Sequence, residues 1–285
     1  HRDLHRVDRR QRQMCIRDRL VMVQTEVVAR RLRERYGYRG RVLVCSTAVT
    51  PALRGGTDEP PVPEVLRGLQ HKMKLLYVTR YYPHKNLEGI VELFRRHGGA
   101  LRDVVIITTV GADQHAGARR FLGAIDRYGL SGQIINVGPI PHGEVGAYYR
   151  HCDALFMPTL LETFGIPYLE AMCFDLPVIT SDLDFAHAVC GDAALYFDPW
   201  DPAAARDAIL SLKSDARLRQ RLIAAGRQRL NQEYRSWDEI TAEVLKQLRA
   251  IVEESRSGRA ESVSTRAGRS PAQAGAAPTE RTQEQ

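Results

Sequence analysis

The chain has 285 residues, 44% of them hydrophobic and 26% charged, which is enough for one or two domains with a buried core. No apolar run approaches the roughly 18 to 20 residues of a membrane-spanning helix, and the start lacks the apolar region of a signal peptide. The net charge of +7 comes mostly from residues 1–19 and 255–285, where no aromatic residues interleave with the arginines. This pattern argues against nucleic-acid binding.

The five cysteines are odd in number and scattered, without metal-ligand spacing. They favour a reduced, cytoplasmic setting over a disulfide scaffold. They are Cys15, Cys45, Cys152, Cys173 and Cys190.

The first part of the chain has three sections. Residues 1–19 show no periodicity, and QRQMCIRDR resembles translated vector sequence, so we expect a non-native or disordered leader. From Leu20 a short apolar run precedes an amphipathic helix that ends at Gly37, and a strand follows at residues 41–47. Residues 51–64 are rich in proline and glycine, which predicts a linker.

Residues 65–254 alternate between apolar strands and amphipathic helices, and this pattern predicts an α/β domain with a doubly wound, Rossmann-like parallel sheet. From residue 255 the composition of Ser, Arg, Ala, Gly and Pro predicts a disordered tail. The five expected strands are residues 74–79, 104–110, 133–137, 154–157 and 176–180. The expected helices are residues 86–97, 114–128, a helix from about 166, and 201–214, 215–234 and 237–254.

Two carboxylates, Glu162 and Glu170, lie eight residues apart across a glycine turn. Gly165 lets backbone approach a ligand closely, and Pro167 suits the first turn of a helix, so a helix should begin near Ile166 with its N–H groups free to bind a phosphate. Glu170, one turn into that helix, can accept hydrogen bonds from a pair of hydroxyls beside the phosphate. A single glutamate in such a turn is more often a solvated helix cap than a ligand contact, so one carboxylate alone would not indicate a binding site.

Two cations precede the helix at 86–97. Arg80 and Lys85 lie in the string RYYPHKN at the carboxyl edge of the predicted sheet, where ligands of open parallel sheets bind. Together they would offset the charge of a diphosphate and stabilise it as a leaving group. Either cation alone would be read as a solvated surface residue.

The strings ETFGIPYLEAM and LPVITSD, with the R-x(4)-K-N element at Arg80, resemble the retaining nucleotide-sugar glycosyltransferases of the GT-B fold, family GT4. The resemblance covers roughly residues 20–250. It implies that residues 65–254 are the nucleotide-sugar donor-binding domain, the C-terminal half of a GT-B fold, and that residues 20–50 are a remnant of the N-terminal acceptor-side domain. The chain departs from the family at Asp175, where glycine is usual, and at Ala188, where glutamate is usual.

The resemblance also implies a reaction, the transfer of a hexosyl-type group from a nucleoside diphosphate sugar to an acceptor hydroxyl with retention. Glu170 would hold the ribose diol, Arg80 and Lys85 the diphosphate, and Glu162 the sugar hydroxyls and the positive charge that develops at the ring. The further donor-binding positions are the backbone at Phe164, Gly165 and Ile166, facing the distal phosphate or the sugar, and Gly138 and Ile140, facing the base.

The expected partners are a nucleotide-sugar donor and a glycan, lipid-linked or small-molecule acceptor, with no metal or other cofactor and no nucleic acid. The resemblance allows a peripheral membrane contact through the missing first domain, at the inner face of the membrane. Without that domain we expect weak donor binding and little turnover. His142 has no identifiable carboxylate partner and is not expected to be a general base.

Two alternative hypotheses for the function remain. A non-catalytic nucleotide-sugar-binding module would share the fold. The second alternative is another enzyme of the GT-B fold, a nucleotide-sugar epimerase or a phosphorylase. Epimerase relatives, however, lack the E-x(7)-E string, and a phosphorylase would need a cofactor lysine context that the sequence does not contain.

Overall fold

The computed structural model describes residues 20–48 and 61–267. The chain divides into two compact units, residues 1–237 and residues 238–285. The expected leader at residues 1–19 and most of the expected linker lie outside the described residues.

The N-terminal segment forms a small parallel pair of strands, β1 (Leu20–Val23) and β2 (Arg41–Val44), joined by helix α2 (Glu26–Tyr36). Thr25 caps α2, because its side chain accepts a hydrogen bond from the Val28 amide at 3.3 Å. The helix ends at Gly37, whose φ of 62° is the left-handed conformation typical of a helix C-terminus. The helix and the second strand are therefore confirmed.

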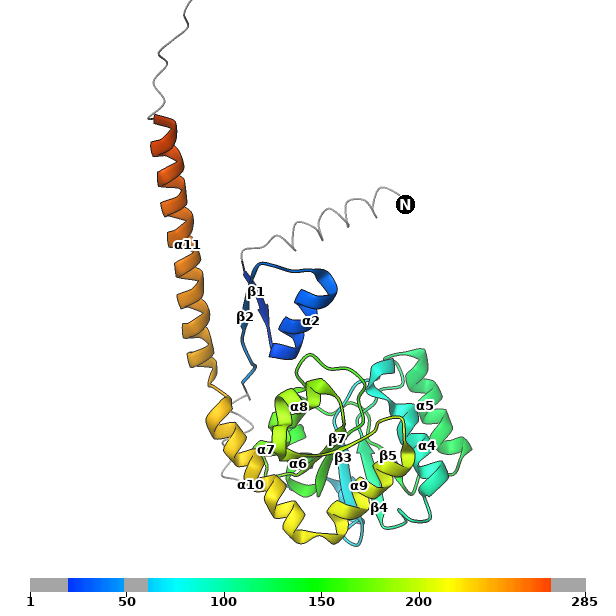
Figure 1. The fold of residues 1–285 in the computed structure, drawn as a ribbon. Helices are drawn as coiled ribbons and strands as arrows, with labels where there is room; N and C mark the ends of the chain where they lie inside the picture. The colour runs from blue at the N-terminus through cyan, green and yellow to red at the C-terminus, as the bar shows by residue number, and fades with distance from the viewer. Residues whose placement is uncertain (1–19, 49–60, 268–285) are drawn as a thin grey trace, which may run out of the picture. The chain divides into compact units, whose positions relative to one another are not determined.

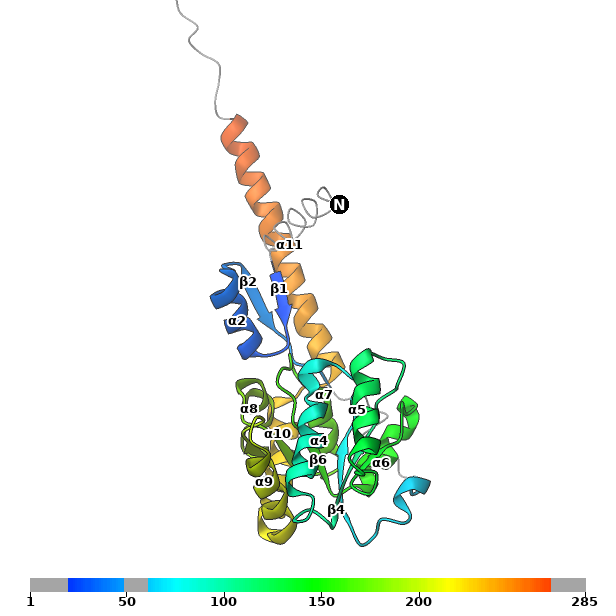
Figure 2. The ribbon, with the colours of Figure 1, turned by 90° about the vertical axis from the view of Figure 1, so that its right-hand side faces the viewer.

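The main body is a six-stranded parallel sheet in the order β5-β4-β3-β6-β7-β8, with helices on both faces (Figure 1, Figure 2). Its strands are β3 (Met73–Tyr77), β4 (Val104–Thr108), β5 (Ile134–Asn136), β6 (Ala154–Met157), β7 (Val178–Ser181) and β8 (Ala194–Phe197). Its helices are α4 (Leu87–His97), α5 (Ala116–Arg127), α6 (Val145–His151), α7 (Ile166–Cys173), α8 (Asp184–Cys190), α9 (Pro202–Ser214) and α10 (Ala216–Glu233). Four short 3-10 helices are η1 (Glu64–Leu66), η2 (Pro83–Lys85), η3 (His142–Glu144) and η4 (Gly191–Ala193).

The order of the strands fixes which helices share a face. Right-handed crossovers place α4 and α5 on one face and α6, α7 and α8 on the other, because the chain reverses direction across the sheet after β5. Helix α9 packs against α4, and α10 packs against α7. The strands β4 and β6 are buried along their whole length, as expected for strands covered on both faces. The doubly wound α/β prediction is confirmed.

Two predictions differ from the structure: the number of strands and the end of the last helix. We predicted five strands, but β8 is a sixth; it lies at the edge of the sheet and its two central side chains are partly exposed, so it is not the fully buried run that β6 and β7 are. Helix α11 (Trp237–Ala267) continues past residue 254, so the expectation of disorder is wrong for residues 255–267. Residues 268–285 lie outside the described residues.

Asp175 stands just after α7 with φ at 55°, a left-handed conformation that glycine adopts more readily. Its carboxylate contacts the Arg227 guanidinium of α10 at 2.5 and 2.6 Å. This two-point contact links the end of α7 to α10. Aspartate tolerates the left-handed conformation better than most residues, so the turn does not require the usual glycine.

Candidate functional site

The predicted site residues come from turns that leave the carboxyl ends of neighbouring strands. Arg80 and Lys85 follow β3, Gly138 and Ile140 follow β5, and residues 162–166 follow β6. Because all strands of this sheet are parallel, these turns lie at the same edge. That edge is where open parallel sheets bind ligands.

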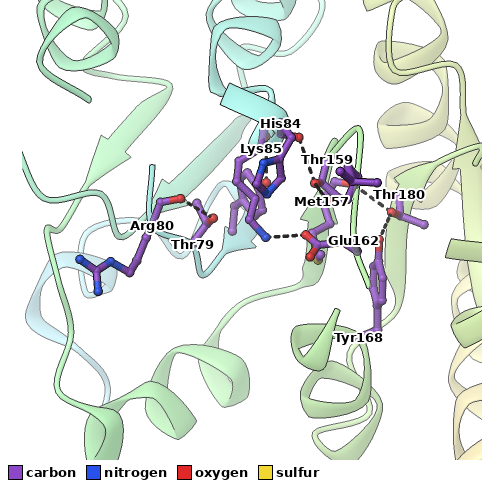
Figure 3. Close-up of polar contacts among 11 residues, drawn as sticks. Thr79, Arg80, His84, Lys85, Met157, Thr159, Glu162, Tyr168 and Thr180 are labelled. Carbon is purple, nitrogen blue, oxygen red and sulfur yellow. Dashed lines mark hydrogen bonds and ion pairs between the residues drawn. The ribbon is translucent and has the colours of Figure 1, made fainter. Parts of the chain in front are cut away.

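Lys85 and Glu162 meet at this edge. The Lys85 ammonium contacts Glu162 Oε1, and the two side chains are 17% and 12% exposed (Figure 3). Arg80 is exposed, and in Figure 3 its guanidinium points away from this pair. The structure therefore brings together one predicted cation and one predicted carboxylate, while the second cation lies outside the contact.

The turn that carries Lys85 is fixed by buried polar contacts. The Tyr77 hydroxyl donates a hydrogen bond to the Lys85 carbonyl oxygen at 2.8 Å. Asn86 adopts a left-handed conformation with φ of 55°, which asparagine tolerates better than most residues. Its amide donates to the carbonyl oxygens of Pro158 and Pro199 at 3.1 Å each. Asn86 thus ties the turn after β3 to the chain segments after β6 and β8.

His84 joins the same turn to the loop after β6. Its carbonyl oxygen accepts hydrogen bonds from the Leu160 amide at 2.7 Å and the Thr159 hydroxyl at 3.1 Å (Figure 3). Burial is the first cause that lowers the pKa of the His84 imidazole, and the charge of Lys85 lowers it further, against an opposing effect of Glu162. The lowered pKa favours the neutral form of the imidazole.

The entry into α7 depends on Gly165. Its φ is 86°, and a Cβ atom there would lie 2.6 Å from the Tyr168 ring. The Tyr168 hydroxyl lies 2.7 Å from Thr180 Oγ1, which donates to the Met157 carbonyl oxygen at 2.9 Å (Figure 3). Helix α7 begins at Ile166, as predicted, with Pro167 in its first turn. Its N-terminus is thus anchored to β6 and β7.

The predicted contacts at 164 and 166 differ in kind. Phe164 is buried, with its ring edge-on to the Tyr234 ring at 5.8 Å between centroids. Only its backbone is available to a ligand. Ile166 is 44% exposed at the start of α7.

Glu170 lies one turn into α7, half-buried, and accepts a hydrogen bond from the Tyr149 hydroxyl at 2.7 Å. Burial is the main cause that raises the pKa of this carboxyl, while the Tyr149 hydrogen bond and the charge of His142 act in the opposite direction. His142 belongs to the turn after β5 that also carries Gly138, at φ 74°, and Ile140. Glu170 therefore lies within electrostatic reach of the turn predicted to face the base.

Sequence reasoning missed the residues that hold this site in place. Asn86 is part of the R-x(4)-K-N element, and its tolerance of the left-handed conformation was an available signal. Tyr149 is fully buried and packs in the core, and its hydroxyl also contacts a predicted site residue. The other missed residues are Tyr77, Thr159, Tyr168 and Thr180, which carry no spacing signal.

A cavity of about 190 Å³ lies between α4 and α9, and Asn86 is one of the residues that line it. Its lining includes Phe156, Phe197 and the exposed ring of Trp200. No Lys, Arg or His is among the described residues that line it, so it does not suit a diphosphate.

The described residues, 20–48 and 61–267, contain neither a metal-binding cluster nor a membrane-spanning helix. No group of three or more His, Cys, Asp or Glu side chains there is arranged to hold a metal ion. Within the same residues, no helix combines the length and apolar character needed to cross a membrane.

Comparison with known families identifies the fold. The model of the family described as "Glycosyl transferases group 1" matches residues 65–229, more than half of the chain. The chain belongs to this family. Its sheet is that of the C-terminal domain of a GT-B glycosyltransferase, as the resemblance implied.

Similar curated proteins include sugar transferases. An O-antigen chain mannosyltransferase, RfbU of Salmonella typhimurium, is 27% identical over 138 residues, covering 48% of this chain and 38% of that protein. A probable sucrose-phosphate synthase 2 of rice is 27% identical over 204 residues, covering 64% of this chain and 21% of the relative. The glycosyltransferase domain thus spans well under half the length of these relatives.

Solved glycosyltransferases share the fold. Sucrose-phosphate synthase from Thermosynechococcus elongatus matches with a TM-score of 0.69 at 22% identity, over 82% of this chain and 59% of that one. The Anabaena protein HepE, solved in complex with UDP and glucose, matches with a TM-score of 0.68 at 14% identity, over 81% and 63% of the two chains.

Proposed function

We propose that this chain is the donor-binding part of a retaining glycosyltransferase that takes a hexosyl-type group from a nucleoside diphosphate sugar and transfers it to an acceptor hydroxyl. The observation that carries the proposal is the contact of Lys85 with Glu162 beside the N-terminus of α7, with Glu170 one turn into that helix. A cation, a helix N-terminus and two carboxylates at one sheet edge match the parts of a nucleotide sugar.

The charges suggest how a donor would be accommodated. A diphosphate at this edge would attract the Lys85 ammonium away from Glu162, and Arg80, which is exposed, could swing toward it. Glu162 would then be free to accept hydrogen bonds from the sugar hydroxyls and to stabilise positive charge at the ring. The backbone at 164–166 would face the distal phosphate or the sugar, and Gly138 and Ile140 the base. Catalysis would consist mainly of stabilising the departing diphosphate.

The base of the donor can be identified by calorimetric titration of the 285-residue chain with UDP, GDP and ADP. We expect one of them to bind, and Glu170→Ala to weaken that binding about 5- to 150-fold, as for a lost hydrogen bond to a charged group. Glu64→Ala, an exposed glutamate that precedes the amino end of β3, is the control and should bind as the wild type does. Titration with and without EDTA tests the expectation that no metal is needed.

The proposal would be overturned if none of the three nucleotides bound at millimolar concentration, or if Glu170→Ala and Glu64→Ala bound equally well. Retention is tested separately, by NMR of the anomeric configuration of the transferred sugar. If nucleotide bound and a longer relative with the same site also failed to transfer sugar, the non-catalytic module would be the better reading.

A further inference from the structure

Tyr149 of α6 donates a hydrogen bond to Glu170 from the interior of the domain. Its side chain is fully buried, and its ring stacks on Phe174 at 5.5 Å between centroids with an interplanar angle of 5°. The Arg150 guanidinium carbon lies 5.4 Å from the centroid of the same Phe174 ring. The phenol is thereby held in one position, with its hydroxyl 2.7 Å from Glu170 Oε2.

This hydrogen bond has two physical consequences for the carboxylate. A carboxylate has two oxygens and about four acceptor positions, so a single donor on Oε2 fixes its rotation and leaves Oε1 for a ligand. Burial of Glu170 disfavours the charged form, and the donated hydrogen bond counteracts this by lowering the pKa. The Tyr149 hydroxyl itself stays protonated, because burial and the Glu170 charge raise its pKa well above the ordinary value.

We infer that Tyr149 is the positioning residue for Glu170, orienting its carboxylate toward the 2′ and 3′ hydroxyls of the donor ribose without itself touching the nucleotide. The inference rests on the proposed function, which assigns Glu170 to the ribose. The inference adds that the preference for a nucleotide with ribose hydroxyls over a dideoxynucleotide depends on the buried Tyr149 hydroxyl.

The test compares the nucleoside diphosphate that binds with its 2′,3′-dideoxy counterpart, on wild type and Tyr149→Phe. Phenylalanine keeps the ring that stacks on Phe174 and removes only the hydroxyl. We expect Tyr149→Phe to weaken binding of the ribonucleotide about 5- to 30-fold and to leave binding of the dideoxynucleotide unchanged. The matched control is Tyr148→Phe, the preceding and partly exposed tyrosine of the same helix, which should change neither affinity.

A pH series separates positioning from a general loosening of the fold. The ionised carboxylate is the better acceptor for the diol, so ribonucleotide affinity should fall as pH drops through the pKa of Glu170. The charge of His142 lowers that pKa in both proteins, but without the Tyr149 hydrogen bond it is higher, so the fall should begin at higher pH in Tyr149→Phe than in wild type. Binding of the dideoxynucleotide should not show this displacement.

The outcomes separate a failure of the proposed function from a failure of the role inferred for Tyr149. If wild type binds both nucleotides equally well, the assignment of Glu170 to the ribose fails, and this inference fails with it. If wild type discriminates and Tyr149→Phe discriminates to the same degree with the same pH profile, the proposed function stands and the role of Tyr149 is overturned. Equal weakening of both nucleotides would also overturn it, because it would show a structural effect.

Discussion

Lys85 and Glu162 neutralise each other in a setting with little access to solvent, since their side chains are only 17% and 12% exposed. Such a pair contributes little net stability compared with apolar residues, but removal of one member leaves the other charge buried without compensation. The same property suits a donor site, because an incoming diphosphate can replace Glu162 as the partner of Lys85.

Replacement of both members of this pair should therefore cost less than the sum of the two single replacements. We expect Lys85→Met to lower the free energy of unfolding by about 3 kcal/mol at pH 7, because Glu162 is left unpaired. The double variant Lys85→Met/Glu162→Met should be less destabilised than the sum of the two single variants. Urea denaturation of the four proteins measures this, and strictly additive losses would show that the two side chains do not interact.

Ser181, the last residue of β7, offers a contrast with its neighbour. Its hydroxyl oxygen is buried and has no hydrogen-bond partner among the described residues, whereas the Thr180 hydroxyl contacts both Tyr168 and Met157. Ser181→Ala should leave stability unchanged or raise it by up to about 2 kcal/mol, since an unsatisfied buried hydroxyl is removed. Thr180→Val should lower it by about 1–3 kcal/mol. Equal losses in the two variants, measured by denaturation, would contradict this account of Ser181.

Among the secondary-structure elements, the turn that leads into α7 positions both carboxylates, because Glu162 precedes it and Glu170 follows it. The turn combines the left-handed backbone of Gly165 with close contact to the Tyr168 ring. The position of α7 therefore depends on a glycine at residue 165.

Gly165→Ala should lower the free energy of unfolding by about 3 kcal/mol, from backbone strain and from the clash with Tyr168. Gly129→Ala provides the control: its φ is 64°, but a Cβ there meets nothing within 4 Å, so only the backbone cost of about 1–2 kcal/mol applies. Thermal and urea unfolding of the two variants test the difference. A loss at Gly165 no larger than that at Gly129 would contradict the role of the Tyr168 contact.

The sequence predicted elements where periodicity and end signals agree. Helix α4 could be predicted from its stripe of Leu87, Ile90, Val91 and Phe94, and all four side chains are buried. Strand β8 could not, because it lies at the edge of the sheet with its two central side chains partly exposed, and so lacks the fully buried run that marks β6 and β7. The rule that parallel strands end at one edge predicts that Lys85 and Glu162 lie at the same edge of the sheet, but not that they form an ion pair. The contact of Tyr149 with Glu170 joins residues from two helices through tertiary packing, and no spacing indicates it.

At the scale of the molecule, the candidate site is assembled from turns that are distant in sequence. The N-terminal segment also reaches this region: Arg30 and Arg31 of α2 contact Asp184, the first residue of α8, at 3.1 and 2.5 Å. The Thr25 hydroxyl donates to the Thr163 carbonyl oxygen at 3.4 Å. One ligand at this edge should therefore stabilise several separate segments at once.

Hydrogen–deuterium exchange of the 285-residue chain, with and without saturating UDP, GDP or ADP, measures whether these segments respond together to one ligand. We expect the nucleotide that binds to slow exchange together in residues 80–86, 138–142 and 162–171. Protection concentrated at residues 197–205, beside the cavity between α4 and α9, would place the nucleotide elsewhere and contradict the account.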